Sequence, residues 1–303
     1  MKNLLILSDK EGWHSRQIEA SAIKENFSVQ IKDIRDLSIS LEDGCKFIVD
    51  EKNKKINPDC VFVRFIPGGS LEEIVIYLNI LKVMKLNGCD VVNDAHSIET
   101  TVDKSLTTIK LRDKQVLTPD TWIIRGFDRA YNKVEQLIKN FPIIYKPLFG
   151  SQGTGIKLIS SLQDFENINN ESNIYYFQKF IETKPSHDYR VLIITGKRKV
   201  SIFAMTRYGQ SYINNFSMGA KCSPFTSEKT IIERSIEVSK IFNMPICGVD
   251  LIKDKNDIYV IEINSIPAWK GLQSVSDSNI ASAIIQNIFN TRDIEKKILH
   301  TKI

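Results

Sequence analysis

The stretch Tyr145–Gly155, YKPLFGSQGTG, decides how the rest of the chain is interpreted. Its three glycines, Gly150, Gly153 and Gly155, allow backbone N–H groups to approach an anion closely. Strand-like apolar segments flank it on both sides, so we expect a glycine-rich hairpin that folds over phosphate groups. A P-loop is excluded because no Gly-Lys-Ser/Thr follows, and a dinucleotide-binding turn is excluded because no helix opens after the last glycine.

Lys146 lies on the strand that enters this hairpin. Its ammonium group can pair with a phosphate oxygen as a point charge. The stretch therefore predicts nucleotide binding, and it leaves open the alternative of a mobile hairpin with a surface lysine.

A second polar pattern lies near the C-terminus. Glu262 and Asn264 are two residues apart in the apolar segment YVIEINSIP, so they lie on one face of one strand. Asp250 belongs to the preceding strand of an expected hairpin and can lie opposite them. A carboxylate in such an apolar setting is costly without a cation partner. Three oxygen donors suit Mg²⁺, and the alternative is a structural pairing with Arg or Lys.

Polar residues between these two motifs suit the same chemistry. Arg190 begins an apolar strand, where it either holds a phosphate or carboxylate or lies at the core edge. Arg207 offers a planar guanidinium suited to a carboxylate, and Asn215 adds an amide near the predicted metal. Each alone is typical of a solvated loop, but together with the two motifs they indicate ATP-dependent chemistry.

The N-terminal part of the chain alternates strands and helices. Strands are expected at 4–7, 29–31, 60–65 and 90–92, with helices at 18–23 and 71–88, the second opened by a capping box at Ser70–Glu73. This alternation predicts an α/β unit with a parallel sheet over residues 1–98.

Two further units are expected, at 99–185 and 186–303. A helix over 99–115 leads into the first, and further helices are expected at 127–140, 227–242 and 279–289. Strands at 189–194, 200–205, 248–252 and 258–263 are separated by turn signals, which indicates hairpins and an antiparallel sheet. The fold class is therefore α/β in the broad sense that includes α+β.

Composition excludes several other classes of protein. The 303 residues are 42% hydrophobic and 25% charged, which is ordinary for a globular protein. The net charge of +5 comes from interspersed residues without a basic–aromatic motif, so we expect no nucleic-acid partner. The five scattered cysteines contain no C-x-x-C pair, which indicates reduced core thiols and a cytoplasmic location. No run approaches the length of a membrane span, so we expect no membrane association.

The order of the motifs resembles that of the ATP-grasp superfamily, and within it the RimK-like amino-acid ligases. The segments that carry the resemblance are Thr101–Lys104, Tyr145–Gly155, Phe177–Ile181, Asp188–Arg190, Asn215–Lys221, Gly248–Asp250 and Ile261–Gln273. Gly12–His14 and Val63–Glu73 resemble a subgroup linked to methanopterin- and methylofuran-type one-carbon cofactors. The resemblance implies an ATP-grasp fold with a parallel N-terminal pre-ATP-grasp domain, a central lid domain and a C-terminal antiparallel-sheet domain.

The resemblance also implies residue roles. The nucleotide-binding set is Lys104, Lys146, Gly150, Ser151, Gln152, Gly153, Gly155, Gln178, Lys179, Phe180, Ile181 and Asp188. Within it, the two lysines at 104 and 146 contact the ATP phosphates, main-chain groups at 179 and 180 hold the adenine, and Asp188 touches the ribose or adenine side. The metal set is Asp250, Glu262 and Asn264, for two Mg²⁺ ions with Mn²⁺ as an alternative. The catalytic set is Arg190 near the triphosphate, Arg207 at the acceptor carboxylate and Asn215 at the acyl phosphate.

The implied activity is that of an ADP-forming acid–amino-acid ligase. It joins L-glutamate to a carboxylate of a small-molecule cofactor through an acyl phosphate. The alternatives are modification of a protein C-terminus or a carrier protein, and a non-catalytic ATP-binding regulatory protein, which the retained metal set disfavours. Met218 stands where the family often has a basic residue, which bears on the identity of the acceptor. Related enzymes are often dimers or tetramers, so a homo-oligomer is among the expected states.

Overall fold

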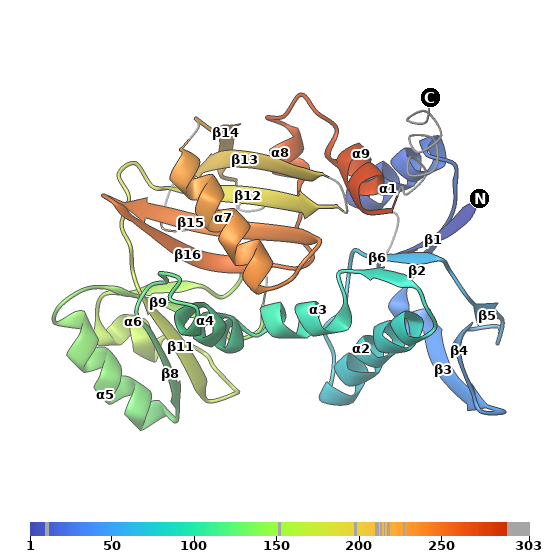
Figure 1. The fold of residues 1–303 in the computed structure, drawn as a ribbon. Coiled ribbons are helices and arrows are strands. Elements are labelled where there is room, and N and C mark those ends of the chain that lie inside the picture. The colour runs from blue at the N-terminus through green and yellow to red at the C-terminus, as the bar shows by residue number, and fades with distance from the viewer. Residues whose placement is uncertain are drawn as a thin grey trace.

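The computed structural model describes residues 1–9, 12–150, 153–196, 199–209, 212, 214, 216, 219–226 and 228–289. This part of the chain folds around a parallel sheet with a small hairpin sheet beside it, and around two antiparallel sheets (Figure 1). The expected parallel N-terminal sheet and antiparallel C-terminal sheet are confirmed. The division of the chain into units at 98 and 185 stays a prediction.

The parallel sheet has the strand order β2-β1-β6-β7. Its elements are β1 (Lys2–Leu7), α1 (Trp13–Lys24), β2 (Phe27–Lys32), β6 (Cys60–Val63), α2 (Leu71–Leu86) and β7 (Asp90–Val92). Leu4 and Ile6 pack in one core cluster with Ile18 of α1, whereas Leu5 and Leu7 pack in another, with residues of α2. The two helices therefore cover opposite faces, which explains why the strands are continuous apolar runs.

The sheet β3-β4-β5 was not predicted. It comprises β3 (Leu37–Glu42), β4 (Cys45–Asp50) and β5 (Lys55–Ile56), preceded by a 3-10 turn at Ile34–Asp36. Asp43 and Gly44 join the first two strands with φ of 51° and 71°. Positive φ at both loop residues is the type I′ hairpin turn, for which Asp-Gly is a strong sequence signal.

The helix expected over 99–115 is two helices, α3 (Ala95–Val102) and α4 (Lys104–Asp113). Asp103 breaks them apart because its carboxylate accepts hydrogen bonds from the amides of Ser105 and Leu106, which makes it the N-cap of α4. The break places Lys104 in the first turn of α4.

The first antiparallel sheet, which we call the lid sheet, has the order β10-β9-β11-β8. Its elements are β8 (Thr121–Arg125), α5 (Phe127–Ile138), β9 (Ile143–Lys146), β10 (Lys157–Ile159), α6 (Leu162–Glu166) and β11 (Ile174–Lys179). Tyr145 and Phe177 face a core cluster with α5 and α6, whereas the alternate residues Lys146 and Gln178 face the other way, into a pocket. The glycine-rich segment joins β9 to β10, which confirms the predicted hairpin.

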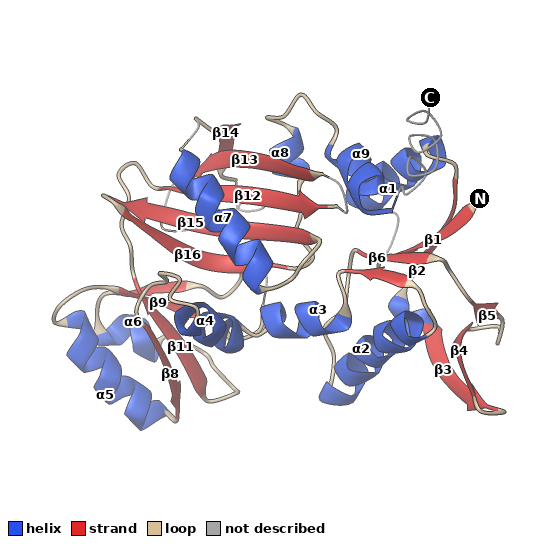
Figure 2. Ribbon diagram, viewed as in Figure 1, coloured by secondary structure: helices blue, strands red, loops and turns tan. Residues whose placement is uncertain are grey.

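The second antiparallel sheet, the five-stranded sheet, has the order β14-β13-β12-β15-β16. Its elements are β12 (His187–Thr195), β13 (Val200–Tyr208), β14 (Lys221–Pro224), α7 (Lys229–Ile241), β15 (Ile246–Asp254) and β16 (Asp257–Asn264). Val191 and Val249 lie under α7, which crosses this sheet in Figure 2. By strand alternation Arg190 and Asp250 lie on the opposite face.

The C-terminal elements pack between the parallel sheet and the five-stranded sheet. They are α8 (Lys270–Gln273), α9 (Ile280–Ile284) and a short π-helix (Ile285–Phe289), the last two replacing the single helix expected there. One core cluster contains Leu4 of the parallel sheet, Leu192 of the five-stranded sheet and Trp269. The N-terminal sheet and the five-stranded sheet therefore share a core.

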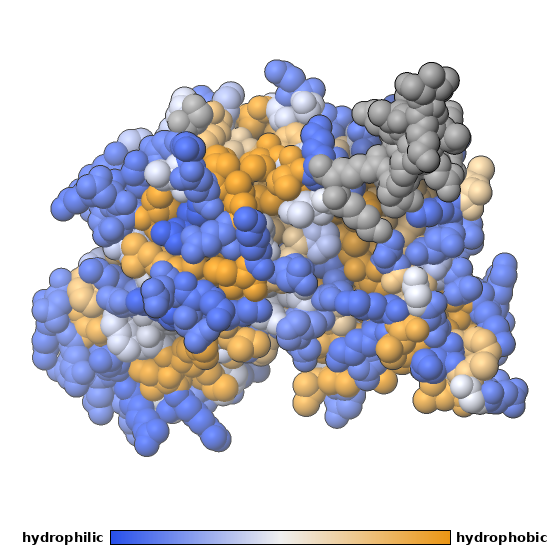
Figure 3. Space-filling view, in the orientation of Figure 1, coloured by the Kyte–Doolittle hydropathy of each residue, from blue (hydrophilic) through white to orange (hydrophobic). Residues whose placement is uncertain are grey.

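The surface and the cysteines are as expected for a globular protein. Hydrophilic side chains cover much of the face in Figure 3, with apolar patches among them. All five cysteines are free thiols. The expectation that they lie in the core is confirmed for Cys60, Cys89 and Cys247 and is wrong for Cys45, which is exposed. In the part of the chain that the structure describes, no helix is both long and apolar enough to span a membrane.

Candidate active site

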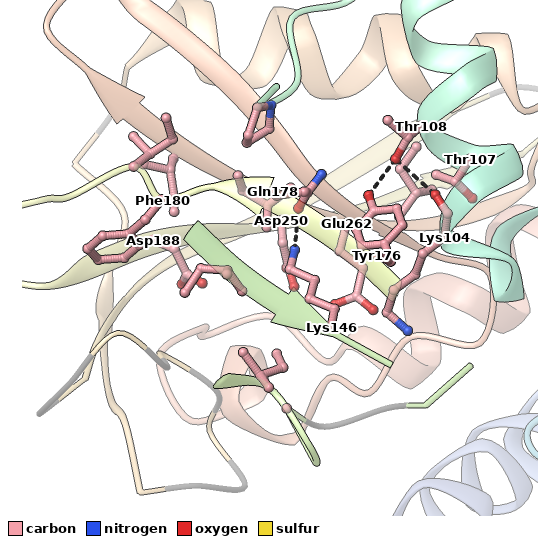
Figure 4. Close-up of a pocket in the computed structure, with 18 of the residues that line it drawn as sticks. Lys104, Thr107, Thr108, Lys146, Tyr176, Gln178, Phe180, Asp188, Asp250 and Glu262 are labelled. Carbon is pink, nitrogen blue, oxygen red and sulfur yellow. Dashed lines mark hydrogen bonds between the residues drawn. The ribbon is translucent and has the colours of Figure 1, made fainter. Parts of the chain in front are cut away.

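Most of the sequence-predicted residues come together around one pocket, between the lid sheet and the hairpin β15–β16 (Figure 4). Its lining includes Lys104, Lys146, Gly150, Gly153, Gln178, Lys179, Phe180, Ile181, Asp188, Asp250 and Glu262. Gly155, Arg190, Arg207 and Asn264 are not part of this lining. Ser151, Gln152 and Asn215 lie outside the described residues, so their predicted roles are untested.

Part of the pocket wall is apolar and suits the flat faces of a nucleobase. This wall includes Leu111, Pro119, Ile144, Ile252 and Ile261. At its edge the amide of Lys179 donates to the carbonyl of Asp120 at 2.8 Å, and that of Phe180 donates to the carbonyl of Pro142 at 3.1 Å. Within the described residues the amide of Ile181 has no such acceptor. Of these three amides, that of Ile181 is therefore the one available to a base.

Two lysines enter the pocket from different elements. Lys146, the last residue of β9, donates from Nζ to Oε1 of Gln178 at 2.6 Å. Lys104, at the start of α4, donates from Nζ to the carbonyl oxygens of Gly150 at 3.0 Å and Leu148 at 3.4 Å. Lys104 thus ties α4 to the glycine-rich hairpin.

Both amines are partly desolvated. Burial lowers the pKa of Lys146 to about 8, and the nearby Glu262 carboxylate opposes this shift. Burial also lowers the pKa of Lys104, again opposed by Glu262. Two cations around one carboxylate leave an excess of positive charge, which suits a polyphosphate.

A hydrogen-bonded pair, Thr108 and Tyr176, supports this cationic region and was missed by the sequence analysis. Thr108 and Tyr176 share a hydrogen bond of 2.7 Å between their hydroxyl oxygens, and Thr108 also donates to the carbonyl of Lys104 at 2.8 Å (Figure 4). Burial raises the pKa of Tyr176 to about 12, so its hydroxyl stays protonated. No spacing rule pairs a helix residue with a strand 68 positions away, so this contact needs the three-dimensional fold.

A β-bulge shapes the acidic hairpin. Asp250 pairs with Glu262 and Leu251 with Val260, which leaves Ile261 as the extra residue. The bulge lets both Val260 and Ile263 join the core under α7, although they are three residues apart. Glu262 therefore lines the pocket beside Ile261, and the prediction that Asp250 lies opposite the next strand is confirmed.

Two arginines hold the neighbouring carboxylates. Arg207 makes a bidentate contact with Asp188, with both hydrogen bonds at 2.7 Å, and its Nη2 lies 3.1 Å from Oδ2 of Asp250. Arg190 donates from Nη2 to the same Oδ2 at 2.8 Å and pairs through Nε with Oδ1. Burial alone would lower the pKa of Arg207, but the carboxylates of Asp250 and Asp188 raise it above its ordinary value.

These contacts bear on two predicted roles. Both oxygens of Asp188 accept from Arg207, and both oxygens of Asp250 face Arg190. The roles of Asp188 at the nucleotide and of Asp250 at a metal stay predictions, and the structural pairing with arginine is present for both carboxylates.

Gly248 allows the elements around Asn264 to converge. A Cβ atom at Gly248 would lie 2.8 Å from Cβ of Pro267, 3.2 Å from Nη1 of Arg190 and 3.5 Å from Cβ of Asn264. Glycine is therefore required by close approach, since its φ is not positive. The buried Nδ2 of Asn264 has no hydrogen-bond partner among the described residues.

The donor set fits a hard divalent cation. Across the described part of the chain, no group of three His, Cys, Asp or Glu side chains forms a metal site. The candidate donors are instead mixed: the carboxylate of Glu262, the amide of Asn264, and the carboxylate of Asp250, which would first have to release an arginine. Mg²⁺ accepts such oxygen donors when phosphate oxygens and water complete its shell. Among the described residues Glu262 makes no ion pair within 4.0 Å, so its carboxylate is available to a cation.

The chain matches the family model of the RimK-like ATP-grasp domain over residues 101–288. It is 24% identical over 299 residues to the tetrahydromethanopterin:alpha-L-glutamate ligase of Methanococcus maripaludis, covering 94% of this chain and 97% of that protein. It is 28% identical over 223 residues to a probable alpha-L-glutamate ligase of a Marinomonas species, covering 70% and 71%.

Solved structures share the fold. A RimK domain ATP-grasp protein from Sphaerobacter thermophilus has a TM-score of 0.71 at 14% identity, covering 95% of this chain and 100% of that one. The macrocyclase MdnC of Microcystis aeruginosa, bound with precursor peptide MdnA, has a TM-score of 0.73 at 16% identity, covering 96% and 100%. The ATP-grasp ligase PsnB, complexed with minimal precursor, Mg and ADP, has a TM-score of 0.68 at 14% identity, covering 93% and 95%. These similarities confirm the ATP-grasp fold, and with the domain match they show that this chain belongs to the RimK-like ATP-grasp family of ligases.

Proposed function

We propose that the protein is an ADP-forming ligase that adds L-glutamate to a carboxylate of a small-molecule cofactor of the methanopterin or methylofuran type. The observation that carries the proposal is the extent of similarity to the tetrahydromethanopterin:alpha-L-glutamate ligase, which covers 94% of the chain. That match includes most of the N-terminal third, whereas the domain model covers only 101–288. An acceptor-specific part of the enzyme is expected outside the shared ATP-using domain.

In this proposal ATP is a substrate bound in the pocket. A carboxylate oxygen of the acid attacks the γ-phosphorus, so an acyl O–P bond forms and the bond to ADP breaks. The amino group of glutamate then attacks the acyl carbon. The acyl C–O bond breaks, phosphate leaves with that electron pair, and the nitrogen gives up its proton.

The described side chains supply positioning and electrostatics for these steps. Lys104 and Lys146 hold the phosphates, and the bond from Lys104 to Gly150 anchors the start of the glycine-rich hairpin beside them. Closure of this hairpin over ATP is expected to exclude water. Glu262, Asp250 and Asn264 would hold magnesium, which neutralises charge on the transferring phosphoryl group.

The remaining predicted roles belong to the same proposal. Arg190 lies beside Asp250, near the triphosphate. Arg207 was predicted at the acceptor carboxylate; because its guanidinium is already occupied by Asp188 and Asp250, we propose instead that it is a positioning residue. Asn215 is assigned to the acyl phosphate.

The test is an acceptor screen with purified protein, Mg²⁺, ATP and labelled L-glutamate. Tetrahydromethanopterin and methylofuran precursors, coenzyme F420 and a purified carrier protein serve as acceptors, and ADP release is measured beside mass spectrometry of each acceptor. We expect ADP release with a one-glutamate mass gain on a cofactor. If only the carrier protein gained glutamate, the acceptor would be a protein and not a small-molecule cofactor. If the protein bound nucleotide but released no ADP with any of the acceptors, ligation would be contradicted.

A further inference from the structure

A group of cationic and aromatic side chains lies outside the nucleotide pocket, where the parallel sheet meets the segment after β16. We propose that Arg64 and Lys270 bind a non-reacting carboxylate group of one of the two substrates, either the acid or the amino acid. The inference rests on the proposed ligase function, because it concerns how that reaction positions its substrates. Neither residue lines the pocket described above.

The topology of the parallel sheet favours a ligand at this place. The chain runs from β1 to β2 on one side and returns to β6 on the other, so the strand order reverses between β1 and β6. Ligands of open parallel sheets bind outside the carboxyl ends of the strands at such a point. Arg64 directly follows β6, and its amide donates to the carbonyl of Leu7, the last residue of β1, at 2.8 Å.

Arg64 has unused donors at this edge. Its Nη1 donates to the carbonyl of Pro267 at 3.0 Å, and its guanidinium carbon lies 5.3 Å from the centre of the Trp269 ring. Burial lowers the pKa of Arg64 to about 10, so it stays charged at neutral pH, and Asp9 is the acidic residue that opposes this shift. Among the described residues it forms no ion pair within 4.0 Å. A partly buried guanidinium with five donors and one neutral acceptor is costly unless an anion joins it.

Apart from Asp9, the described side chains around Arg64 include a neutral histidine and a further cation. The backbone amide of Trp269 donates to Nε2 of His14 at 3.1 Å, so His14 accepts and is neutral. Burial, with the charges of Arg64 and Lys270, lowers the pKa of His14 to about 3. Lys270 follows directly in the chain and is exposed. The buried Nε1 of Trp269 has no hydrogen-bond partner among the described residues, which leaves a second unused donor beside the guanidinium.

This cationic group is connected to the reacting centre through one proline. Pro267, which accepts from Arg64, approaches Gly248 next to Arg190 and Asn264. Arg64 and Asn264 therefore lie on either side of Pro267, and we expect a substrate whose carboxylate rests on Arg64 to extend toward Asn264. A dicarboxylate suits this arrangement, and it is either L-glutamate or an acid that ends in a glutamyl group.

The test is a binding titration read by tryptophan fluorescence. The chain has three tryptophans, and Trp13 and Trp269 flank His14 with ring centroids at 4.9 Å and 4.5 Å. Trp122 lies in the lid sheet, so Trp122→Phe restricts the signal to the proposed site. With Mg²⁺ and AMPPNP present, this protein is titrated with L-glutamate, with N-acetyl-L-glutamate, which lacks a free amine and can replace only the acid, and with L-glutamine as the monocarboxylate.

We expect saturable binding of at least one of the two dicarboxylates, tighter than that of L-glutamine. Arg64→Gln and Lys270→Gln should each weaken it by about tenfold or more, since each removes a charged partner. Arg16→Gln removes an exposed charge from the same region and should leave the affinity unchanged. A response to L-glutamate assigns the site to the amine donor, and a response to N-acetyl-L-glutamate alone assigns it to the acid.

The inference would be overturned if neither dicarboxylate bound saturably. It would also be overturned if both variants bound the dicarboxylate as tightly as the parent protein does. If Arg64→Gln does not fold, the exposed Lys270→Gln carries the same test. The acceptor screen separates this result from failure of the ligase proposal. Ligation with unchanged KM values for both acids in the two variants refutes this site alone, whereas carboxylate binding without ADP release refutes ligation alone.

Discussion

Replacing Arg207 by methionine should strongly destabilise the protein before any substrate is present. Arg207 is 3% exposed and makes two hydrogen bonds of 2.7 Å to Asp188, with a third contact of 3.1 Å to Asp250. Methionine keeps much of the apolar stem but leaves two largely buried carboxylates short of a cation. Removing one partner of a buried ion pair costs about 3–5 kcal/mol, which is a large share of a typical stability of about 5–15 kcal/mol.

The assay is urea denaturation of the wild type and variants, with a double-mutant cycle. Asp188→Asn removes the charge that Arg207→Met strands, so the double variant should lose about 0.5–3 kcal/mol less than the sum of the single losses. Arg112→Met is the matched control, because the Arg112–Asp120 pair is 45% and 61% exposed and should matter by less than about 1 kcal/mol.

The reasoning would be refuted if Arg207→Met unfolded at the urea concentration of the wild type. Strict additivity of the two single substitutions would also refute it. In either case Arg207 would be available for direct contact with a substrate carboxylate, as the family resemblance first implied.

Three further perturbations test the pocket and its support. Burial lowers the pKa of Lys146 from 10.5 to about 8, so the folded state holds this proton less tightly than the unfolded chain. The free energy of unfolding of the wild type, relative to Lys146→Met, should therefore rise between about pH 8 and 10.5, by up to about 3 kcal/mol, and a difference that stays flat with pH would contradict this. Glu262→Gln should lower the turnover for ADP release by at least about 10², whereas the exposed Glu166→Gln should not, and equal rates in the two variants would remove Glu262 from the reaction. Gly248→Ala would bring its Cβ to 2.8 Å from a proline side chain and should cost about 1–3 kcal/mol in urea denaturation. Gly68→Ala, which has open space around it, is the control, and equal midpoints would show that the close packing at 248 is not needed.

Much of the pocket could be predicted from local pattern. The strand–glycine–strand order around Gly150 and Gly153 was enough for a hairpin, and the i, i+2 spacing of Glu262 and Asn264 was enough for one strand face. The capping box at Ser70–Glu73 also forms as expected, with reciprocal hydrogen bonds of 2.8 Å and 3.3 Å. Each of these features depends on residues that are close in sequence.

Features that depend on pairing between strands were not predictable. The bulge at Ile261 appears only in the register of β15 against β16, because a single strand carries no sign of the extra residue. The bidentate contact of Arg207 with Asp188 joins residues 19 positions apart on paired strands, and the sequence analysis gave them separate roles. Their mutual approach could be inferred only after β12 and β13 were aligned.

Two local signals were present but were not used. Asp43-Gly44 between two apolar segments is a hairpin signal, and it does form the turn of β3 and β4. Asp103 within the expected helix over 99–115 is a good N-cap residue, and it divides that helix. Reading the two signals would have given the extra hairpin and the position of Lys104 at a helix start.

The most direct test of the central claim is a crystal structure with AMPPNP and Mg²⁺. The account predicts a triphosphate contacted by Lys104 and Lys146, with an ion bound by Glu262 and Asn264 at about 2.1 Å from its oxygen ligands. Asp250 should then turn at least one oxygen from Arg190 toward an ion. A nucleotide bound elsewhere, or a triphosphate and ion that leave Glu262 without contact, would contradict the account.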